Sequence, residues 1–529
     1  AVNHSWAIMG AMKELVYHRL LMPAIDRHQD KTAVVDGGFR STFTEHAERT
    51  ARAANMLSEL GVGRADRFGV MALNSHRFLE LQHAAFLGAG VINPLNLRLA
   101  GKELKYIIED SGTEVLFVDG FFAQMVADAL GDDSPVRTTV LLGEGDVPHD
   151  HRYEDLLAAA SSAMPDEPEE DDPVVLMYTG GTTGLPKGVL HTQRSQMLNL
   201  YHNAIHLDLL DDTVWLTQTP MFHGASTGGM MGVIPIGGVH VSIPVFDPGA
   251  VLDVIETEGV TMSIMVPTMI GMMFAHESYR PERLATMRQL AYGASPMPDA
   301  ILDRLLSELP DLELIQGYGM TECSATLSFL LPEDHVPGSA RLRSVGRPVM
   351  GVTISIRDDD GNEVPTGEIG EVWARGGNWM REYWNKPEAT EEAFVDGWYR
   401  TGDAGRVDDD GYLFLVDRVK DMIVTGGENV YSAEVENAIS THPGVAQVAV
   451  IGIPDERWGE AVHAIIVPVP GHEITLEMIV AHARESIAGY KLPKSVDFRS
   501  EPLPLSGAMK VLKRELRAPY WEGHDRNVG

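Results

Sequence analysis

The chain has 529 residues, more than one hydrophobic core normally organises, so its length predicts a large region with subdomains and at least one smaller domain. Its 76 acidic and 42 basic side chains give a formal net charge of −34, which opposes binding to nucleic acid or to anionic lipid surfaces. A single cysteine, Cys323, excludes an intrachain disulfide and favours a reducing compartment.

The first ten residues, AVNHSWAIMG, lack the basic segment and apolar core of a secretory signal, so we expect a cytoplasmic protein.

The first α/β pattern begins at Arg67. Strands are predicted over 67–73, 91–96 and 114–120, and helices over 76–90, with Ser75 as N-cap, and over 102–112. This βαβαβ order predicts a parallel sheet covered by helices.

Residues 213–246 contain no Asp, Glu, Lys or Arg. Prolines and glycines interrupt their apolar pieces, so we interpret them as interior wall rather than as a membrane span. A second α/β unit follows, with strands predicted over 260–267, 289–295 and 312–319, and a helix over 298–309 that begins at a proline. Ligands in such folds gather where the strand ends meet.

The last third of the chain has a different texture. After Arg341 the pattern favours short strands with turns at Asp360-Gly361 and Asp410-Gly411. From Asp417 a small α+β region follows, with helices predicted over 433–440 and 476–488, strands over 445–452 and 461–469, and a basic segment at 510–517. The predicted fold class is α/β: a large N-terminal domain (1–416) of two similar α/β subdomains and a β-rich subdomain, then a small C-terminal domain (417–529).

The segment MYTGGTTGLPKGV (177–189) is the most distinctive motif, with three glycines and three threonines in six residues. Because residues after Gly188 can enter a helix, we expect the segment to join a strand to a helix. Glycine N–H groups and threonine hydroxyls form a cradle for anionic oxygens, which favours phosphate binding over a plain surface turn. The segment matches neither the Walker pattern nor G-x-G-x-x-G.

Residues 178–188, YTGGTTGLPKG, resemble the signature loop of the adenylate-forming superfamily of acyl-CoA synthetases, luciferases and peptide-synthetase adenylation domains. Further motifs of that family follow in order: QGYGMTE (316–322), GWYRTGD (397–403), DRVKDMIVTGGENVY (417–431) and GYKLP (489–493). The resemblance covers nearly the whole chain. It implies a ligase that uses ATP and Mg²⁺ to form an acyl adenylate and then passes the acyl group to coenzyme A, with a mobile C-terminal domain hinged at Asp417.

For adenylate formation, the resemblance implies a phosphate-binding set that comprises Thr179, Gly181, Thr182, Thr183, Gly184 and Lys187. Gly180 stands where many relatives have Ser. Thr321 and Glu322 match the positions that touch the α-phosphate and bind Mg²⁺. Lys510 matches the C-terminal lysine that reaches both the attacking carboxylate and the α-phosphate, although Met509 replaces the glycine that usually precedes it.

The resemblance also assigns the nucleoside and coenzyme A contacts. Tyr318 matches the aromatic residue that stacks on adenine, and Asp403 the carboxylate that accepts both ribose hydroxyls, joined by Arg418. The remaining positions form two groups: Gly293, Ala294 and Ser295 beside the base and acyl group, and Gly426, Gly427 and Lys491 along the path of coenzyme A, with Lys491 near its phosphates.

His223 limits which class of acid the enzyme is expected to accept. It is also the fourth catalytic candidate, besides Thr321, Glu322 and Lys510. Amino-acid-activating relatives place an Asp at this position after Phe222, and an unpaired ammonium in an apolar pocket costs several kcal/mol, so amino acids are disfavoured. We expect a medium- or long-chain fatty acid or an aryl acid. Ser226 and Thr227 are candidates to bind a ring hydroxyl. Five methionines form either a pliable acyl pocket or ordinary core: Met221, Met230, Met231, Met265 and Met269.

Three functions stay open. A carboxylic acid:CoA ligase is favoured over an acyl-AMP ligase that loads a carrier protein or a luciferase-like enzyme, both of which share the first half-reaction. A non-catalytic nucleotide-binding module is the third. The expected partners are the acid, ATP and coenzyme A, without nucleic acid or a transmembrane segment, and a homodimer is left open. We expect Cys323 to be a buried small residue rather than a nucleophile, because no Cys–His arrangement supports it.

Overall fold

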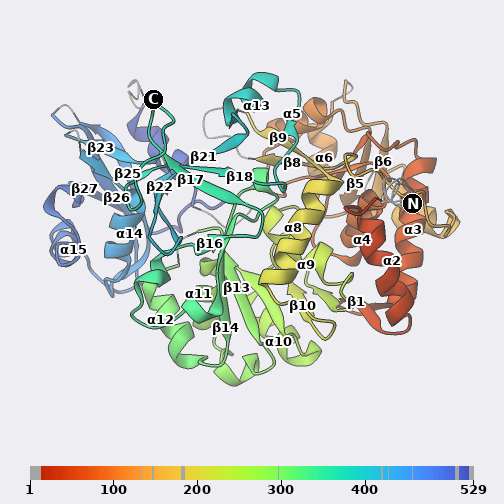
Figure 1. The fold of residues 1–529 in the computed structure, drawn as a ribbon, viewed down its shortest axis with the longest axis horizontal. Coiled ribbons are helices and arrows are strands. Elements are labelled where there is room, and N and C mark those ends of the chain that lie inside the picture. Colours follow the sequence, from red (N-terminus) through yellow and green to blue (C-terminus); the bar gives the residue numbers. More distant parts are fainter. Residues whose placement is uncertain are drawn as a thin grey trace, which may run out of the picture.

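The computed structural model describes residues 13–131, 133–145, 148–179, 185–295, 297–418, 421–426, 428–455, 457–506 and 511–522. It shows a large N-terminal domain beside a smaller C-terminal domain, the latter drawn in blue (Figure 1). Helices and sheets are mixed in both, so the predicted α/β fold class is confirmed.

The first α/β unit is built on a sheet with the strand order β19-β9-β8-β4-β3-β5-β6-β7. Its strands are β3 (Arg67–Met71), β4 (Val91–Pro94), β5 (Val115–Asp119), β6 (Thr138–Leu142), β7 (His151–Arg152), β8 (Pro173–Thr179), β9 (Lys187–Thr192) and β19 (Glu382–Tyr383). Its helices are α3 (Phe43–Glu59), α4 (His76–Phe86), α5 (Gly101–Ser111), α6 (Ala123–Ala129), α7 (Tyr153–Ala159) and α8 (Gln193–His206). The strands β3, β4, β5 and β6 are parallel, which confirms the parallel arrangement predicted for the first three.

Local signals explain where these helices begin and which face they bury. The Ser75 hydroxyl accepts the Phe78 N–H at 3.3 Å, so Ser75 caps α4 as predicted. Leu104, Ile107 and Ile108 of α5 are all buried, because their spacing places them on one helical face.

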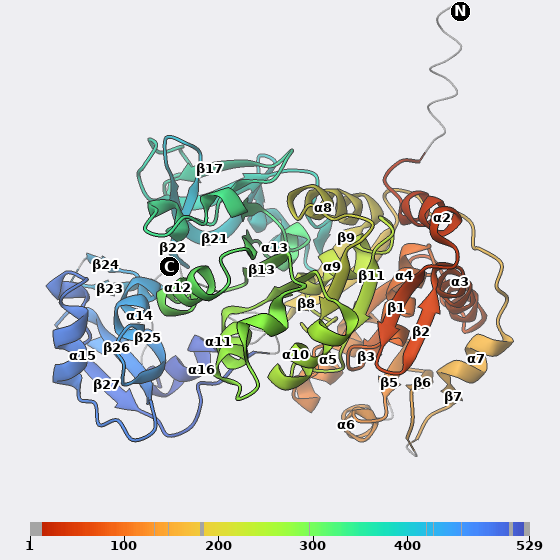
Figure 2. The same ribbon diagram turned by 90° about the horizontal axis from the view of Figure 1, so that it is seen from below.

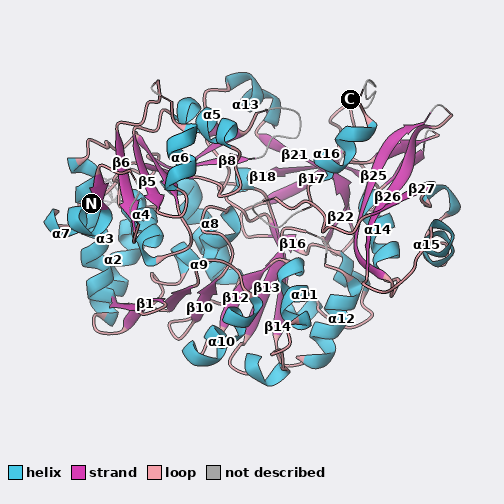
Figure 3. Ribbon diagram, turned by 180° about the vertical axis from the view of Figure 1, so that it is seen from behind, coloured by secondary structure: helices cyan, strands magenta, loops and turns pink. Residues whose placement is uncertain are grey.

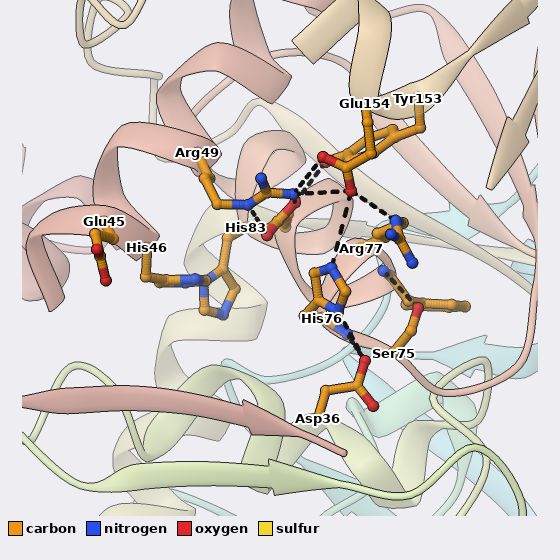
Figure 4. Close-up of polar contacts among 12 residues, drawn as sticks. Asp36, Glu45, His46, Arg49, Ser75, His76, Arg77, His83, Tyr153 and Glu154 are labelled. Atoms are coloured by element: carbon orange, nitrogen blue, oxygen red, sulfur yellow. Dashed lines mark hydrogen bonds and ion pairs between the residues drawn. The ribbon is translucent and has the colours of Figure 1, made fainter. Parts of the chain in front are cut away.

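A network of charged side chains ties α3, α4 and α7 together (Figure 4). The Arg49 guanidinium donates to Glu80 at 2.6 Å and to Glu154 at 3.1 Å. The His76 ring bonds the Asp36 carboxylate at 2.7 Å. Glu80 is almost fully buried, and such a carboxylate is tolerated because it has a cationic partner. The network therefore holds the helices of the first unit in place.

The second α/β unit is built on a sheet with the strand order β16-β15-β14-β13-β12-β10-β11-β1-β2. Its strands are β1 (Thr32–Asp36), β2 (Phe39–Thr42), β10 (Val214–Thr217), β11 (Val239–Ser242), β12 (Met262–Met265), β13 (Gln289–Gly293), β14 (Glu313–Tyr318), β15 (Ser328–Leu330) and β16 (Arg347–Pro348). Its helices are α9 (Thr227–Gly232), α10 (Pro248–Glu258), α11 (Pro267–Ala275) and α12 (Asp299–Glu308), while α2 (Tyr17–His28) packs against α3 and α4 of the first unit. The predicted strands near 260, 289 and 312 are confirmed as β12, β13 and β14.

The uncharged segment 213–246 supplies β10, α9 and β11 to this unit, and most of its side chains are buried. The interpretation as interior wall is therefore confirmed. Within the described ranges, no helix has the length and apolar character needed to cross a bilayer.

The third sheet is the predicted β-rich subdomain. It contains β17 (Thr353–Arg357), β18 (Gly370–Arg375), β20 (Phe394–Val395), β21 (Trp398–Val407) and β22 (Leu413–Arg418), with α13 (Pro387–Ala393) beside it. Gly361 and Gly411 have φ of +82° and +83°, which explains why glycine occupies both predicted turns. Strand β22 crosses the predicted boundary, since the backbone of Asp417 and Arg418 pairs with β21.

The small C-terminal domain has its own sheet and core. Its strands are β23 (Ile423–Thr425), β24 (Glu428–Val430), β25 (Val445–Asp455), β26 (Gly459–Pro468) and β27 (Ser495–Phe498), and its helices are α14 (Ser432–Ser440), α15 (Leu476–Ala483) and α16 (Lys513–Arg517). Seen from behind, the strands β25 and β26 form a long twisted pair flanked by α14 and α15 (Figure 3).

Candidate active site

The predicted phosphate segment connects two strands, not a strand and a helix. Strands β8 and β9 are antiparallel, and Thr179 pairs with Lys187 across them. The Thr179 hydroxyl donates to the Lys187 carbonyl at 3.4 Å. The expectation of a strand-to-helix loop was therefore wrong, because residues 187–192 first form β9 and the helix α8 begins only at Gln193. Gly181, Thr182, Thr183 and Gly184 lie outside the described residues.

Lys187 and Glu322 both contact the same aromatic side chain, Tyr383. The Lys187 ammonium is 4.8 Å from the centre of the Tyr383 ring. The Tyr383 hydroxyl donates to Oε1 of Glu322 at 2.8 Å. Tyr383 is held there because β19 pairs with β9, in the register Tyr383 to Val189. The structure therefore brings the predicted phosphate-binding cation close to the predicted metal-binding carboxylate.

The segment that carries Thr321 and Glu322 is fixed by buried hydrogen bonds. The His191 ring donates to the Thr321 carbonyl at 2.8 Å, and burial lowers the pKa of His191 to about 4, so the ring is neutral at pH 7. The Asn378 amide donates to the carbonyls of Cys323, at 2.9 Å, and Thr326, at 2.7 Å. Three side-chain hydrogen bonds to backbone carbonyls therefore hold this short segment in place.

The ends of β13 and β14 bring the predicted nucleoside residues together. Gly293 pairs with Gly317, and a Cβ at Gly293 would come within 2.2 Å of the Gly317 carbonyl oxygen, so only glycine fits. Ala294 follows with φ of +68° and is exposed, as is part of Ser295. Tyr318 ends the neighbouring strand β14, so these residues leave the sheet side by side.

Tyr318 and Asp403 contact each other. The Tyr318 hydroxyl donates to Oδ2 of Asp403 at 2.5 Å, and burial, assisted by this carboxylate, raises the pKa of Tyr318 well above its usual value. Asp403 lies on β21, in the third sheet, and is 5% exposed. Arg418 pairs with it through the backbone of β22, while the Arg418 side chain lies outside the described part of the chain.

His223 and the neighbouring acyl-site segment lie against the loop that carries Glu322. His223 caps a short 3₁₀ turn, and its Nδ1 accepts the Ala225 N–H at 3.2 Å. A Cβ at Gly224 would meet the Ala325 side chain at 3.2 Å, so the two loops touch. The Ser226 hydroxyl is fully buried and already donates to the Pro220 carbonyl at 2.9 Å, which leaves Thr227 as the better candidate for a ring hydroxyl.

The five methionines do not form one patch. Three of them pack in a core cluster that the two α/β units share and two in the core of the second unit, and each is at most 2% exposed: Met221, Met230 and Met231, and Met265 and Met269. Their environment supports the ordinary-core alternative. Cys323 is also fully buried, and burial raises the pKa of its thiol to about 12. A thiol with such a pKa is a poor nucleophile, which supports the structural role expected for Cys323.

The C-terminal candidates lie in the small domain. Gly426 has φ of +62°, and a Cβ there would come within 2.7 Å of the Trp458 ring. The Lys491 ammonium donates to both carboxylate oxygens of Glu434, at 2.6 and 2.7 Å. Gly427 and Lys510 lie outside the described residues.

Three residues of the site were not predicted from the sequence: Tyr383, Asn378 and His191. Their roles depend on contacts with distant segments, which a local pattern does not reveal. A weak signal existed for Tyr383, since Trp379, Tyr383 and Trp384 form an aromatic cluster directly after Gly376 and Gly377.

Comparisons with known proteins agree with this geometry. Residues 23–384 match the AMP-binding enzyme family, and residues 434–510 match the AMP-binding enzyme C-terminal domain. The chain belongs to the AMP-binding enzyme family. It is an adenylate-forming enzyme of the acyl-CoA synthetase group, so the resemblance predicted from the motifs is confirmed.

Among its relatives in this family is a feruloyl-CoA synthase from Amycolatopsis sp, 40% identical over 92% of this chain and 96% of that protein. The fatty acid–[acyl-carrier-protein] ligase ScoC from Streptomyces coeruleorubidus is 35% identical over 95% and 96%. The structure of a fatty acyl CoA synthetase from Mycobacterium tuberculosis matches with a TM-score of 0.75 and 33% identity, over 97% of this chain and 99% of that one.

Proposed function

We propose that this AMP-binding enzyme is a carboxylic acid:CoA ligase that acts on an aryl acid or on a medium- or long-chain fatty acid. The observation that carries the proposal is the grouping of Lys187 and Glu322 around Tyr383, together with the hydrogen bond between Tyr318 of the second sheet and Asp403 of the third. These side chains provide a cation, a carboxylate, an aromatic ring and a hydroxyl acceptor, which are the groups needed to hold a nucleoside triphosphate.

In the first half-reaction, an oxygen of the acid carboxylate attacks the α-phosphorus of ATP. A bond forms between that oxygen and the phosphorus, the bond to the bridging oxygen breaks, and pyrophosphate leaves with its electron pair. Lys187 would neutralise the departing β- and γ-phosphates. Lys510 would stabilise the charge on the α-phosphate, and Thr321 would orient it.

Glu322 fits a role in holding Mg²⁺. The Tyr383 hydroxyl occupies Oε1 of Glu322, so the carboxylate is oriented by a neighbour before any cation binds. Among the described residues, no group of three or more His, Cys, Asp and Glu side chains is arranged to hold a metal ion. A cation bound at Glu322 would therefore take further ligands from the phosphates, as Mg²⁺ usually does, and would supply charge neutralisation for pyrophosphate departure.

In the second half-reaction, the thiolate of coenzyme A attacks the acyl carbonyl and AMP leaves. We propose that the small domain rotates about Asp417 to bring Gly426 and Gly427 to the site. Lys491 would then exchange its Glu434 partner for a phosphate of coenzyme A. The cation is already positioned by Glu434, so only one ion pair needs to change.

The acid is uncharged apart from its carboxylate. His223 accepts a backbone N–H through Nδ1 and presents no carboxylate that could pair with a substrate ammonium. The relatives include a feruloyl-CoA synthase and a fatty acyl CoA synthetase, whose acids differ in shape but share an apolar body. A carrier-protein acceptor is the second candidate, because ScoC is named for that acceptor. We place the reaction in the cytoplasm, where the buried Cys323 stays reduced.

A panel of acids tests this function. Ferulate, dodecanoate and phenylalanine are each incubated with ATP and Mg²⁺, with and without coenzyme A, while pyrophosphate and thioester are measured separately. We expect pyrophosphate and thioester from ferulate or dodecanoate and neither product from phenylalanine. Pyrophosphate without thioester would favour the carrier-protein acceptor, and no pyrophosphate with either of the first two acids would contradict the proposal.

Lys510→Ala separates the two half-reactions. We expect this variant to lose pyrophosphate formation but to convert supplied acyl adenylate and coenzyme A to thioester at nearly the wild-type rate. An equal loss in both assays would refute the assignment of Lys510 to adenylate formation.

A further inference from the structure

Arg98 joins the two domains. It lies between β4 and α5, and its Nη1 donates to the carbonyls of Leu505, at 3.0 Å, and Ser506, at 3.1 Å. Its own backbone is held by a local turn, in which the Arg98 N–H donates to Oδ1 of Asn96 at 3.0 Å. The guanidinium of the large domain thus bonds two consecutive carbonyls of the small domain.

The position of Arg98 in the first sheet places this contact beside the phosphate segment. Strands β4 and β8 are parallel neighbours, with Ile92 opposite Val175, so their carboxyl ends lie at the same edge of the sheet. Arg98 follows β4 at that edge, and the glycine-rich segment follows Thr179 of β8 there. Leu505 and Ser506 are therefore fastened at the edge from which the predicted phosphate loop departs.

The carbonyls that Arg98 binds belong to one arm of a paired segment. Leu505 pairs with Val511 in an antiparallel bridge, and the Leu512 N–H donates to the Pro504 carbonyl at 2.9 Å. Lys510 immediately precedes Val511 in the sequence. In Figure 2, α16, which follows this segment, lies on the side of the small domain that faces the large domain.

We propose that Arg98 is a positioning residue for adenylate formation. It holds the paired segment, which adjoins Lys510 in the sequence, against the large domain at the edge of the proposed phosphate site, and it releases the segment when the small domain rotates for thioester formation. The charged donor and the two backbone carbonyls suit such a reversible contact, because water replaces either partner once they separate. The inference rests on the proposed function, since it assigns Arg98 to one of its two half-reactions.

The variants Arg98→Ala and Arg98→Lys test the contact, with Arg137→Ala as the matched control. Arg137 is 76% exposed in its side chain, lies at the start of β6 at the opposite sheet edge, and pairs with Glu114 within the same domain. Backbone hydrogen exchange of peptides covering 500–516 is measured without substrates. We expect faster exchange in Arg98→Ala, an intermediate effect in Arg98→Lys and none in Arg137→Ala.

The two half-reactions are then measured with ferulate and dodecanoate and with their synthetic adenylates. We expect Arg98→Ala to lower the rate of pyrophosphate formation about tenfold or more, and to change thioester formation from the adenylate less than twofold. In a Lys510→Ala background, Arg98→Ala should cause no further loss, because it acts through Lys510.

Unchanged exchange, an equal loss in both half-reactions, or a full further loss in the Lys510→Ala background would each overturn the proposal. Faster exchange in an enzyme that releases no pyrophosphate with either acid would leave the contact established and refute the proposed function instead. The exchange measurement therefore separates the two failures.

Discussion

Asn378 supports the short segment that follows Glu322. Its side chain is fully buried, and its amide donates to the carbonyls of Cys323 and Thr326. Between those carbonyls, Ser324 and Ala325 have φ of +57° and +78°, a region that costs residues other than glycine about 1–3 kcal/mol. Asn378→Ala would leave two buried carbonyls without their donor and would remove the restraint on this strained turn.

The expected cost follows from these two hydrogen bonds. A buried group left without its partner costs about 1–3 kcal/mol, so two carbonyls that relax partly cost about 3 kcal/mol together. Unfolding entropy is about 2 cal/mol/K per residue, so in a unit of roughly 400 residues the melting temperature falls by about 3–4 °C. Because Glu322 lies on the released segment, Asn378→Ala should also raise the Mg²⁺ concentration required for half-maximal pyrophosphate formation.

Thermal unfolding and Mg²⁺ titration measure both effects. Asn378→Asp keeps the shape but replaces the donors with acceptors, so it should melt lower than Asn378→Ala at pH 7. Asn437→Ala, at an exposed position on α14, is the control and should shift the melting temperature by less than about 1 °C. Wild-type melting and Mg²⁺ dependence in both Asn378 variants would refute the reasoning, because the two hydrogen bonds would then contribute nothing.

Three further predictions concern the site. Glu322→Gln keeps the Tyr383 hydrogen bond but loses the charge, so the Mg²⁺ requirement for pyrophosphate formation should rise about tenfold; an unchanged titration would exclude Glu322 as the metal ligand. Tyr318→Phe should change the KM for ATP less than Tyr318→Ala, which loses stacking worth about 1–3 kcal/mol; equal effects would argue against stacking. The His191 pKa of about 4 lies below its ordinary 6.5, so the unfolded chain binds more protons between these values and stability falls by about 3 kcal/mol as pH drops from 6.5 to 4. His191→Gln should flatten that part of the profile in acid unfolding measurements, and a slope equal to that of the wild-type protein would contradict the argument.

The elements that the sequence predicted well are those with local causes. Helix α4 starts where Ser75 caps it, and α5 buries the face that its periodicity indicates. The alternating order of strands and helices after Arg67 then predicts a parallel sheet. By contrast, β1 and β2 join the second sheet across a long stretch of chain, and no local pattern indicates that partner.

The candidate site shows the same difference between residues that a local motif indicates and residues that depend on distant segments. Glu322, Tyr318 and Asp403 were predicted because they belong to short motifs with a recognisable spacing. Tyr383 and Asn378 were not, since each acts through a contact with a segment more than 50 residues away. Arg98 is the extreme case, with a partner in the other domain. Such roles become visible only when the fold brings the segments together.

The corrected geometry of the glycine-rich segment changes how phosphate would be bound. In a strand-to-helix loop, the helix N-terminus supplies about half a positive charge to the phosphate. Here α8 begins beyond β9, and its first turn is occupied by Thr192, whose hydroxyl accepts the Ser195 N–H at 3.3 Å. We therefore expect Lys187 to supply positive charge for the phosphate, and Tyr383 contacts both Lys187 and Glu322. One buried ring thus contacts both the cation proposed to bind the outer phosphates and the carboxylate proposed to hold the metal, which a helix dipole alone would not do.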